Sequence, residues 1–190
     1  MNRLSASLVA FSIVAALGGL IAYWPSPVPM PLEAPASSKP SAGKAALSPN
    51  QAHALEKRRA EVKARFDQGA AMLHAKRYDY ALTAFHRVLE LAPDIPEAHV
   101  NLGFTLLGMK RHKEALAFFE SATVLRPWQA NAYYGMAEAM DALGDRSGAI
   151  GAMRTFVHLA QKDDPFVRKA NAALWEWESA REKQAKKQAR

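Results

Sequence analysis

The feature that most constrains this chain is an internal repeat. Pro93 and Pro127 lie 34 positions apart, and each follows a run of apolar residues at helical spacing. Aligning the two prolines also aligns small and aromatic residues at fixed offsets: Gly69 with Gly103, Ala81 with Ala115, and Phe85 with Phe119. One further step of the same length gives Ala137 and Ala149, so three units are predicted at 62–95, 96–129 and 130–163.

Each unit reads as two amphipathic helices. One such pair cannot bury its apolar face alone, whereas stacked pairs bury a continuous core and need caps at both ends. Gly69 and Gly103 each cost about 1 kcal/mol in helix propensity relative to alanine. We expect close approach of the paired helices to be the reason for both glycines. The prediction is an all-α superhelix.

This pattern resembles the tetratricopeptide repeat family over about 102 of the 190 residues. The middle unit carries the resemblance best, with its residues at the family's offsets: Leu102, Gly103, Leu106, Ala115, Phe119 and Pro127. Two kinds of position depart from the family pattern. The usual tryptophan position holds Arg65, His99 and Tyr133, and Gln161 stands where the third unit should end in proline. The resemblance implies a three-unit superhelix of helix-turn-helix repeats, used for protein binding.

Both ends of the superhelix carry helix signals. Ser48, Pro49 and Gln51 form a capping-box pattern, which predicts a helix running to about His74. Asp164-Pro165 begins a last helix with apolar residues at helical spacing: Phe166, Val167, Ala170, Leu174 and Trp177. We therefore predict a repeat domain over 48–180, including a cap helix over 165–180, and then a basic tail over 181–190.

The N-terminus has the composition of a tether. Residues 4–24 carry no charge and follow Arg3, and a helix of this length spans roughly 30 Å, the hydrocarbon thickness of a bilayer. We predict a membrane anchor over 1–24, with a cleaved signal peptide and a buried core helix as the alternatives. Six prolines within 25–40 predict a stiff linker over 25–47. The expected location is a bacterial inner membrane, single-pass, with the repeats in the periplasm.

The residue types that carry chemistry are sparse. The chain has no cysteine, and no two of its six histidines share the i, i+4 spacing of a helical metal pair. It also lacks a glycine-rich phosphate loop and a nucleophile-elbow serine. We therefore predict no catalytic residues, no metal and no cofactor.

The resemblance implies that the first helix of each unit lines a concave groove. The groove residues carried over by alignment are Phe66, Ala70, Leu73, Val100, Asn101, Phe104, Leu107, Asn131, Tyr134, Glu138 and Asp141. Asn101 and Tyr134 are expected at the groove surface, where an amide suits a peptide backbone and a tyrosine suits an interface anchor. The aligned positions hold no cation, so a free C-terminal carboxylate is not the expected ligand.

Two functions from different classes follow. The first is an adaptor that binds another protein in the groove, during assembly of an envelope complex of the cytochrome c maturation, pilus or secretion type. The alternative is a binder of anionic lipid or nucleic acid through the basic tail, which holds four of the net seven positive charges. Nucleic acid is disfavoured because the residues of the repeats are close to neutral. The sequence leaves the partner, the cleavage of the N-terminal segment and homo-oligomer formation open.

Overall fold

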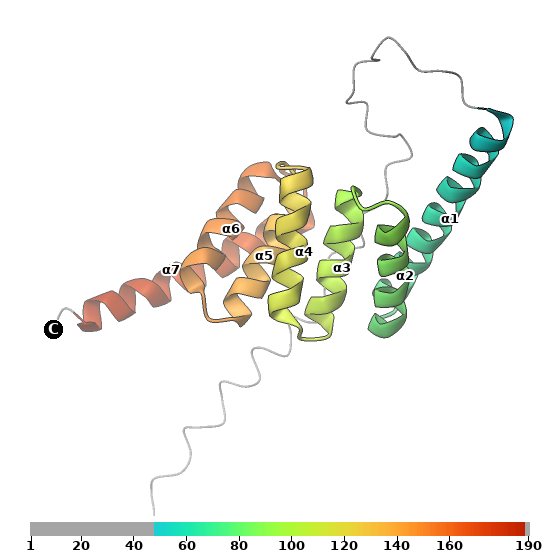
Figure 1. The fold of residues 1–190 in the computed structure, drawn as a ribbon. Coiled ribbons are helices and arrows are strands. Elements are labelled where there is room, and N and C mark those ends of the chain that lie inside the picture. Colours follow the sequence, from blue (N-terminus) through green and yellow to red (C-terminus); the bar gives the residue numbers. More distant parts are fainter. Residues whose placement is uncertain (1–47, 189–190) are drawn as a thin grey trace, which may run out of the picture.

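The structure, a computed structural model, describes residues 48–188 (Figure 1). Seven α-helices form this part of the chain, which confirms the all-α prediction. Their bounds are α1 Pro49–His74, α2 Tyr78–Leu91, α3 Pro96–Gly108, α4 His112–Leu125, α5 Ala130–Ala142, α6 Arg146–Leu159 and α7 Pro165–Gln188. None of these helices is long and apolar enough to cross a membrane. The predicted anchor over 1–24 and the linker over 25–47 lie outside the described residues.

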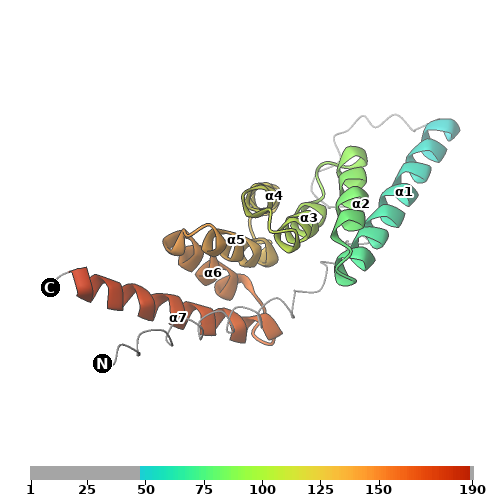
Figure 2. The same cartoon turned by 90° about the horizontal axis from the view of Figure 1, so that it is seen from below.

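The helices form consecutive antiparallel pairs, α1 with α2, α3 with α4, and α5 with α6, which stack in a row (Figures 1 and 2). The first helices of neighbouring pairs contact one another, α1 with α3 and α3 with α5. Among the described helices, α2 and α4 have no comparable contact, nor do α4 and α6. The first helices are therefore on the shorter, inner side of the curved array.

The capping box at the start of α1 is present. The Ser48 backbone N–H donates to Gln51 Oε1 at 2.9 Å, and the Gln51 backbone N–H donates to Ser48 Oγ at 3.3 Å. The helix ends at His74, as the sequence predicted. Residues 49–60 are exposed throughout, so the first half of α1 buries no side chain against the repeat, although Arg58 Nε donates to the Leu91 carbonyl at 2.9 Å.

The turn inside each pair repeats the same backbone geometry. Lys76, Lys110 and Gly144, which occupy equivalent positions in the three units, have positive φ angles of 57°, 60° and 85°. The residue after each one donates its N–H back across the helix end: Arg77 to Met72 O at 2.8 Å, Arg111 to Leu106 O at 2.9 Å, and Asp145 to Met140 O at 2.9 Å. This left-handed residue with its long-range hydrogen bond is the Schellman ending of a helix.

The small residues of the repeat allow the helices to pack closely. A Cβ on Gly69 would lie 2.8 Å from Phe85 Cε1, and a Cβ on Gly103 would lie 2.6 Å from Phe119 Cε1. A Cβ on Gly135 of α5 would come closer still to the Phe119 ring. The alanines at the fixed offsets of the repeat are completely buried: Ala81, Ala115, Ala137 and Ala149. The packing reason expected for the small residues is confirmed.

The residues at the tryptophan position link one unit to the next. His99 Nε2 lies 2.7 Å from the Pro93 carbonyl oxygen, and Tyr133 Oη donates to the Pro127 carbonyl at 2.9 Å. The two contacts occupy equivalent positions in successive units. Each of these contacts fixes the start of one unit to the end of the unit before it. An imidazole and a phenol can replace the indole of tryptophan there because each ring carries a polar atom that reaches the carbonyl oxygen.

The C-terminal boundary predicted at residue 180 is wrong. α7 continues to Gln188, and residues 181–188 form its exposed last turns rather than a separate tail. Lysine, arginine, glutamine and alanine are all strong helix formers, and no glycine or proline interrupts 166–188. The first half of α7 packs against α6 through its apolar face, as expected of the cap.

Candidate protein-binding face

The eleven predicted groove residues lie on α1, α3 and α5, and we call this set the inner face. Seven of them are buried: Phe66, Leu73, Val100, Asn101, Phe104, Leu107 and Tyr134. The other four are partly exposed: Ala70, Asn131, Glu138 and Asp141. The expectation that Asn101 and Tyr134 lie at the surface is therefore wrong, since their exposed fractions are 0% and 7%.

Aromatic packing explains part of this burial. The Phe66 ring meets Phe85 edge to face with centroids 5.7 Å apart, and Phe104 meets Phe119 at 5.0 Å. Tyr134 meets Phe156 at 5.1 Å and Phe166 of α7 at 5.5 Å. These rings turn into the interface between helices, where such pairs contribute about 0.5–1.5 kcal/mol beyond their buried area. Phe66, Phe104 and Tyr134 are thus core residues as well as inner-face residues.

The end of the inner face on α5 is acidic. Burial raises the pKa of Glu138 to about 7, with nearby Asp141 acting in the same direction and Lys169 of α7 opposing it. Burial also raises the pKa of Asp141, against the opposing effect of Arg146, whose Nε lies 3.0 Å from Asp141 Oδ1. Tyr134 has a raised pKa from burial first, with a contribution from Glu138. A cationic ligand group would stabilise the charged forms of these partly buried carboxylates.

The α7 helix borders the acidic end. Lys169 Nζ lies 4.9 Å from the centroid of the Phe166 ring, and the Arg146 guanidinium lies 5.4 Å from that of Trp177. Together with the Tyr134–Phe166 contact, these pairs fix the cap helix beside α5 and α6. The boundary of the acidic end is therefore set by residues of three helices.

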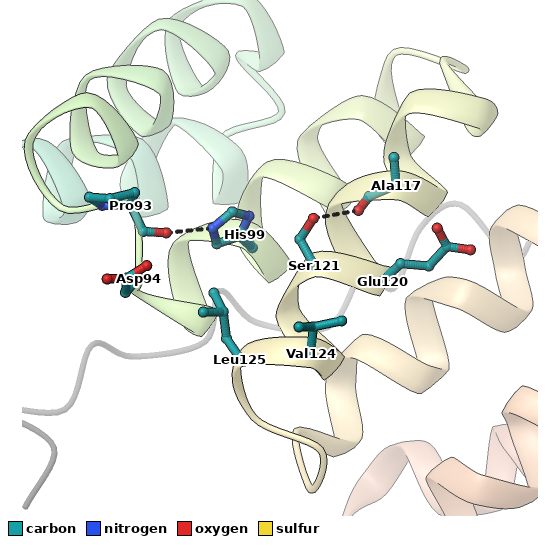
Figure 3. Close-up of a pocket in the computed structure, with 8 residues that line it drawn as sticks. All are labelled: Pro93, Asp94, His99, Ala117, Glu120, Ser121, Val124 and Leu125. Carbon is teal, nitrogen blue, oxygen red and sulfur yellow. Dashed lines mark hydrogen bonds between the residues drawn. The ribbon is translucent and has the colours of Figure 1, made fainter. Parts of the chain in front are cut away.

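A second surface was missed by the sequence reasoning. It is an open hollow on the other side of α3 and α4, lined by Pro93, Asp94, His99, Ala117, Glu120, Ser121, Val124 and Leu125 (Figure 3). Val124 is 81% exposed, and Trp128, four residues further along the chain, is 69% exposed. The repeat itself carried a signal for this surface. The positions of the first unit that are equivalent to Val124 and Trp128 hold charged residues, Glu90 and Asp94. An apolar residue where its repeat equivalent is charged indicates a surface apolar patch.

No group of three or more histidine, aspartate or glutamate side chains within 48–188 is arranged to hold a metal ion. His99, which the sequence placed in an aromatic position, is occupied by its contact with the Pro93 carbonyl. What the inner face presents to solvent is Ala70 on α1 and the polar residues of α5, namely Asn131, Glu138 and Asp141.

Comparison with known proteins agrees with the repeat. Residues 72–123 match the tetratricopeptide repeat family. A search of the curated proteins returned no match.

Solved structures share the fold. MamA 41-end from Desulfovibrio magneticus RS-1 is 28% identical, with a TM-score of 0.57 over 70% of this chain and 72% of that one. The TPR2B domain of yeast Sti1, in a pHsp70 complex, is 16% identical, with a TM-score of 0.59 over 63% of this chain and 98% of that one. The first TPR of Spaghetti (RPAP3), bound to the HSP90 peptide SRMEEVD, is 18% identical, with a TM-score of 0.58 over 63% of this chain and 92% of that one. Residues 72–123 thus match the tetratricopeptide repeat family, and the described helices have the fold of solved tetratricopeptide repeat domains.

Proposed function

We propose that this protein is an adaptor that binds an extended segment of another protein along its inner face and has no catalytic activity. The observation that carries the proposal is the change in chemistry along that face, from apolar on α1 and α3 to acidic on α5. Two structures of the same fold hold a chaperone or a chaperone peptide, which supports a peptide-binding use of such a face. The ligand chemistry differs here, because the acidic end favours a segment with lysine or arginine.

Charge removal at the acidic end tests the proposal. The variant is Glu138→Gln with Asp141→Asn in the full chain, used to capture partners and to screen an array of synthetic peptides. We expect peptides that carry lysine or arginine to lose binding at least tenfold, while thermal unfolding confirms that the variant folds.

The matched control is Asp94→Asn with Glu120→Gln, which removes the same charge from the hollow of Figure 3. The control should bind like the unaltered protein. Equal losses in both variants, or unchanged binding at the acidic end, would refute the adaptor site.

We further propose that the adaptor is tethered to a bacterial inner membrane through residues 4–24, with the repeats in the periplasm and a role in envelope-complex assembly. The uncharged length of 4–24 after Arg3 supports the tether. The mass of the mature protein tests retention of the segment, and a reporter fused to the C-terminus tests the location. A mature chain lacking residues 1–36 would rule out the retained anchor.

A second candidate function has one observation in its favour. The last turns of α7 extend from the body as exposed helix, with Arg181, Lys183, Lys186 and Lys187 in solvent. Such a segment can bind an anionic lipid surface, with about 1 kcal/mol per basic residue. Vesicles with and without phosphatidylserine test it. Binding that depends steeply on salt and is lost on truncation after Ala180 would favour this function over the adaptor.

A further inference from the structure

The hollow of Figure 3 is an apolar surface that the adaptor proposed above does not use. Val124 and Leu125 of α4 line it and are 81% and 38% exposed. Asp94, ahead of α3, and Glu120 of α4 lie on opposite sides of the hollow, and both are exposed (Figure 3). Exposed large apolar side chains that are rimmed by polar ones mark an interaction surface.

The other polar side chains of the hollow are occupied within the chain. His99 Nε2 lies 2.7 Å from the Pro93 carbonyl oxygen, and Ser121 Oγ donates to a carbonyl of its own helix at 2.9 Å. Asp94 and Glu120 differ, because neither carboxylate makes an ion pair in the described part of the chain. The hollow therefore offers an apolar contact together with two carboxylates, which complement a cationic partner.

The complementary chemistry lies at the end of α7. Residues 180–188 are exposed throughout and hold four basic residues and one acidic residue: Arg181, Lys183, Lys186, Lys187 and Glu182. Within the described helices, none of these five side chains is in an ion pair. Ala180, Lys183 and Lys187 share one face of the helix, since they lie at i, i+3 and i+7. A lysine stem can cover an apolar side chain while its ammonium group stays at the charged rim.

The end of α7 does not reach the hollow of its own chain. α7 packs against α6 at the far end of the array, and its last turns point away from α3 and α4 in both views (Figures 1 and 2). The two complementary surfaces can therefore meet only between two copies of the chain.

We propose that the protein associates with itself head to tail, with the basic end of α7 of one copy bound in the hollow of a second copy. Lys183 and Lys187 pair with Asp94 and Glu120, and their stems cover Val124. The two surfaces differ, so the contact is heterologous, and each copy can bind a further copy at its remaining surface. The assembly is a ring if the rotation closes and an open row if it does not.

This contact belongs to the weak and reversible class. Residues 180–188 form a helix end about 13 Å long, which covers less than the roughly 1,600 Å² of a stable interface. Its charge pairs are exposed, so salt weakens them. The inner face lies on the other side of the array, so each copy in the assembly keeps that face for partners.

Site-directed cross-linking of the full chain tests the contact. The chain has no cysteine, so one protein carries Ser121→Cys in the hollow and a second carries Gln184→Cys in α7. We call them the hollow protein and the helix protein. A short bismaleimide should join the mixed proteins at least tenfold more than it joins copies of either protein alone. Equal yields in the mixture and in the separate proteins would rule out the head-to-tail contact.

Charge reversal tests which residues pair. Asp94→Lys with Glu120→Lys in the hollow protein should lower the mixed yield at least tenfold, and so should Lys183→Glu with Lys187→Glu in the helix protein. The mixture of both reversed proteins should recover the yield, because the same pairs then form with opposite charges. Recovery requires that both variants are folded. An unchanged yield after either reversal, or a loss without recovery in variants that keep their helical circular dichroism, would overturn the proposal.

Two further measurements do not depend on the folding of the reversed proteins. Raising the salt concentration from about 0.1 to 1 M should lower the yield of the unreversed mixture, because the screening length falls from about 10 to 3 Å. The control, Glu56→Lys with Asp163→Lys in the hollow protein, makes the same change in net charge at exposed residues outside the hollow and should cross-link as before. A yield that salt does not change, or an equal loss in the control, would contradict the pairing.

Discussion

Phe119 lies so close to Gly103 that a Cβ on the glycine would be 2.6 Å from the ring carbon Cε1. Phe119 is completely buried and is also confined by Gly135 and Phe104. The ring therefore has little room to move away. The helix pair α3 and α4 depends on the absence of one methyl group at residue 103.

Gly103→Ala is therefore expected to destabilise the protein. Overpacking a core costs about 1–3 kcal/mol, and the gain in helix propensity returns about 1 kcal/mol, so we expect a net loss of up to about 2 kcal/mol. The control is Gly151→Ala in α6, where a Cβ would meet no atom within 4 Å. That variant should be stabilised by up to about 1 kcal/mol. Urea unfolding measures the change in the free energy of unfolding for both variants. Changes of the same sign would contradict this account of the repeat glycines.

The ion pair between Glu97 and Arg126 gives a second prediction. Glu97 lies in the first turn of α3 with 3% of its side chain exposed, and it is hydrogen-bonded to the Arg126 guanidinium at the end of α4. Arg126→Ala would leave a buried carboxylate without this partner, at a cost of about 3 kcal/mol in the free energy of unfolding. Arg154→Ala removes the exposed pair with Glu178 and should cost under about 1 kcal/mol. Thermal unfolding compares them, and similar losses would show that the Glu97 pair does not hold α3 to α4.

The raised pKa of Glu138 makes stability depend on pH. In the folded protein this carboxyl holds its proton up to a pKa of about 7, against an ordinary value of 4.5. The protonated carboxyl stabilises the folded protein by an amount on the order of 2–3 kcal/mol. This stabilisation is fully present below pH 4.5 and is lost as the pH rises through 7. Burial is the largest cause of the raised pKa, the charge of Asp141 raises it further, and the charge of Lys169 lowers it.

Glu138→Gln removes this titration, so the variant should gain stability relative to the unaltered protein between pH 4.5 and 7. Melting temperatures of both proteins across pH 4–8 measure the difference. Glu120→Gln, on the exposed side of α4, is the control for loss of a carboxylate. A difference between Glu138→Gln and the unaltered protein that stays constant with pH would contradict the assignment.

The inner face shows the limit of reasoning from the repeat. The alignment placed its eleven residues on the first helices, but Asn101 and Tyr134, expected in solvent, are buried. A position in the repeat fixes which way a side chain leaves its helix. It does not fix what lies opposite, which for Tyr134 is Phe166 of α7, a residue beyond the last repeat unit.

The sequence by itself determined the helix pairs, their period and the small residues at their contacts, because those depend on local spacing and on volumes at fixed offsets. It also determined the start of α1, since a capping box involves only neighbouring residues. Only the tertiary structure decided which inner-face side chains reach solvent and how far burial raises the pKa of Glu138. Those properties depend on residues distant in the sequence that meet when α3, α5 and α7 pack, so no local pattern contains them.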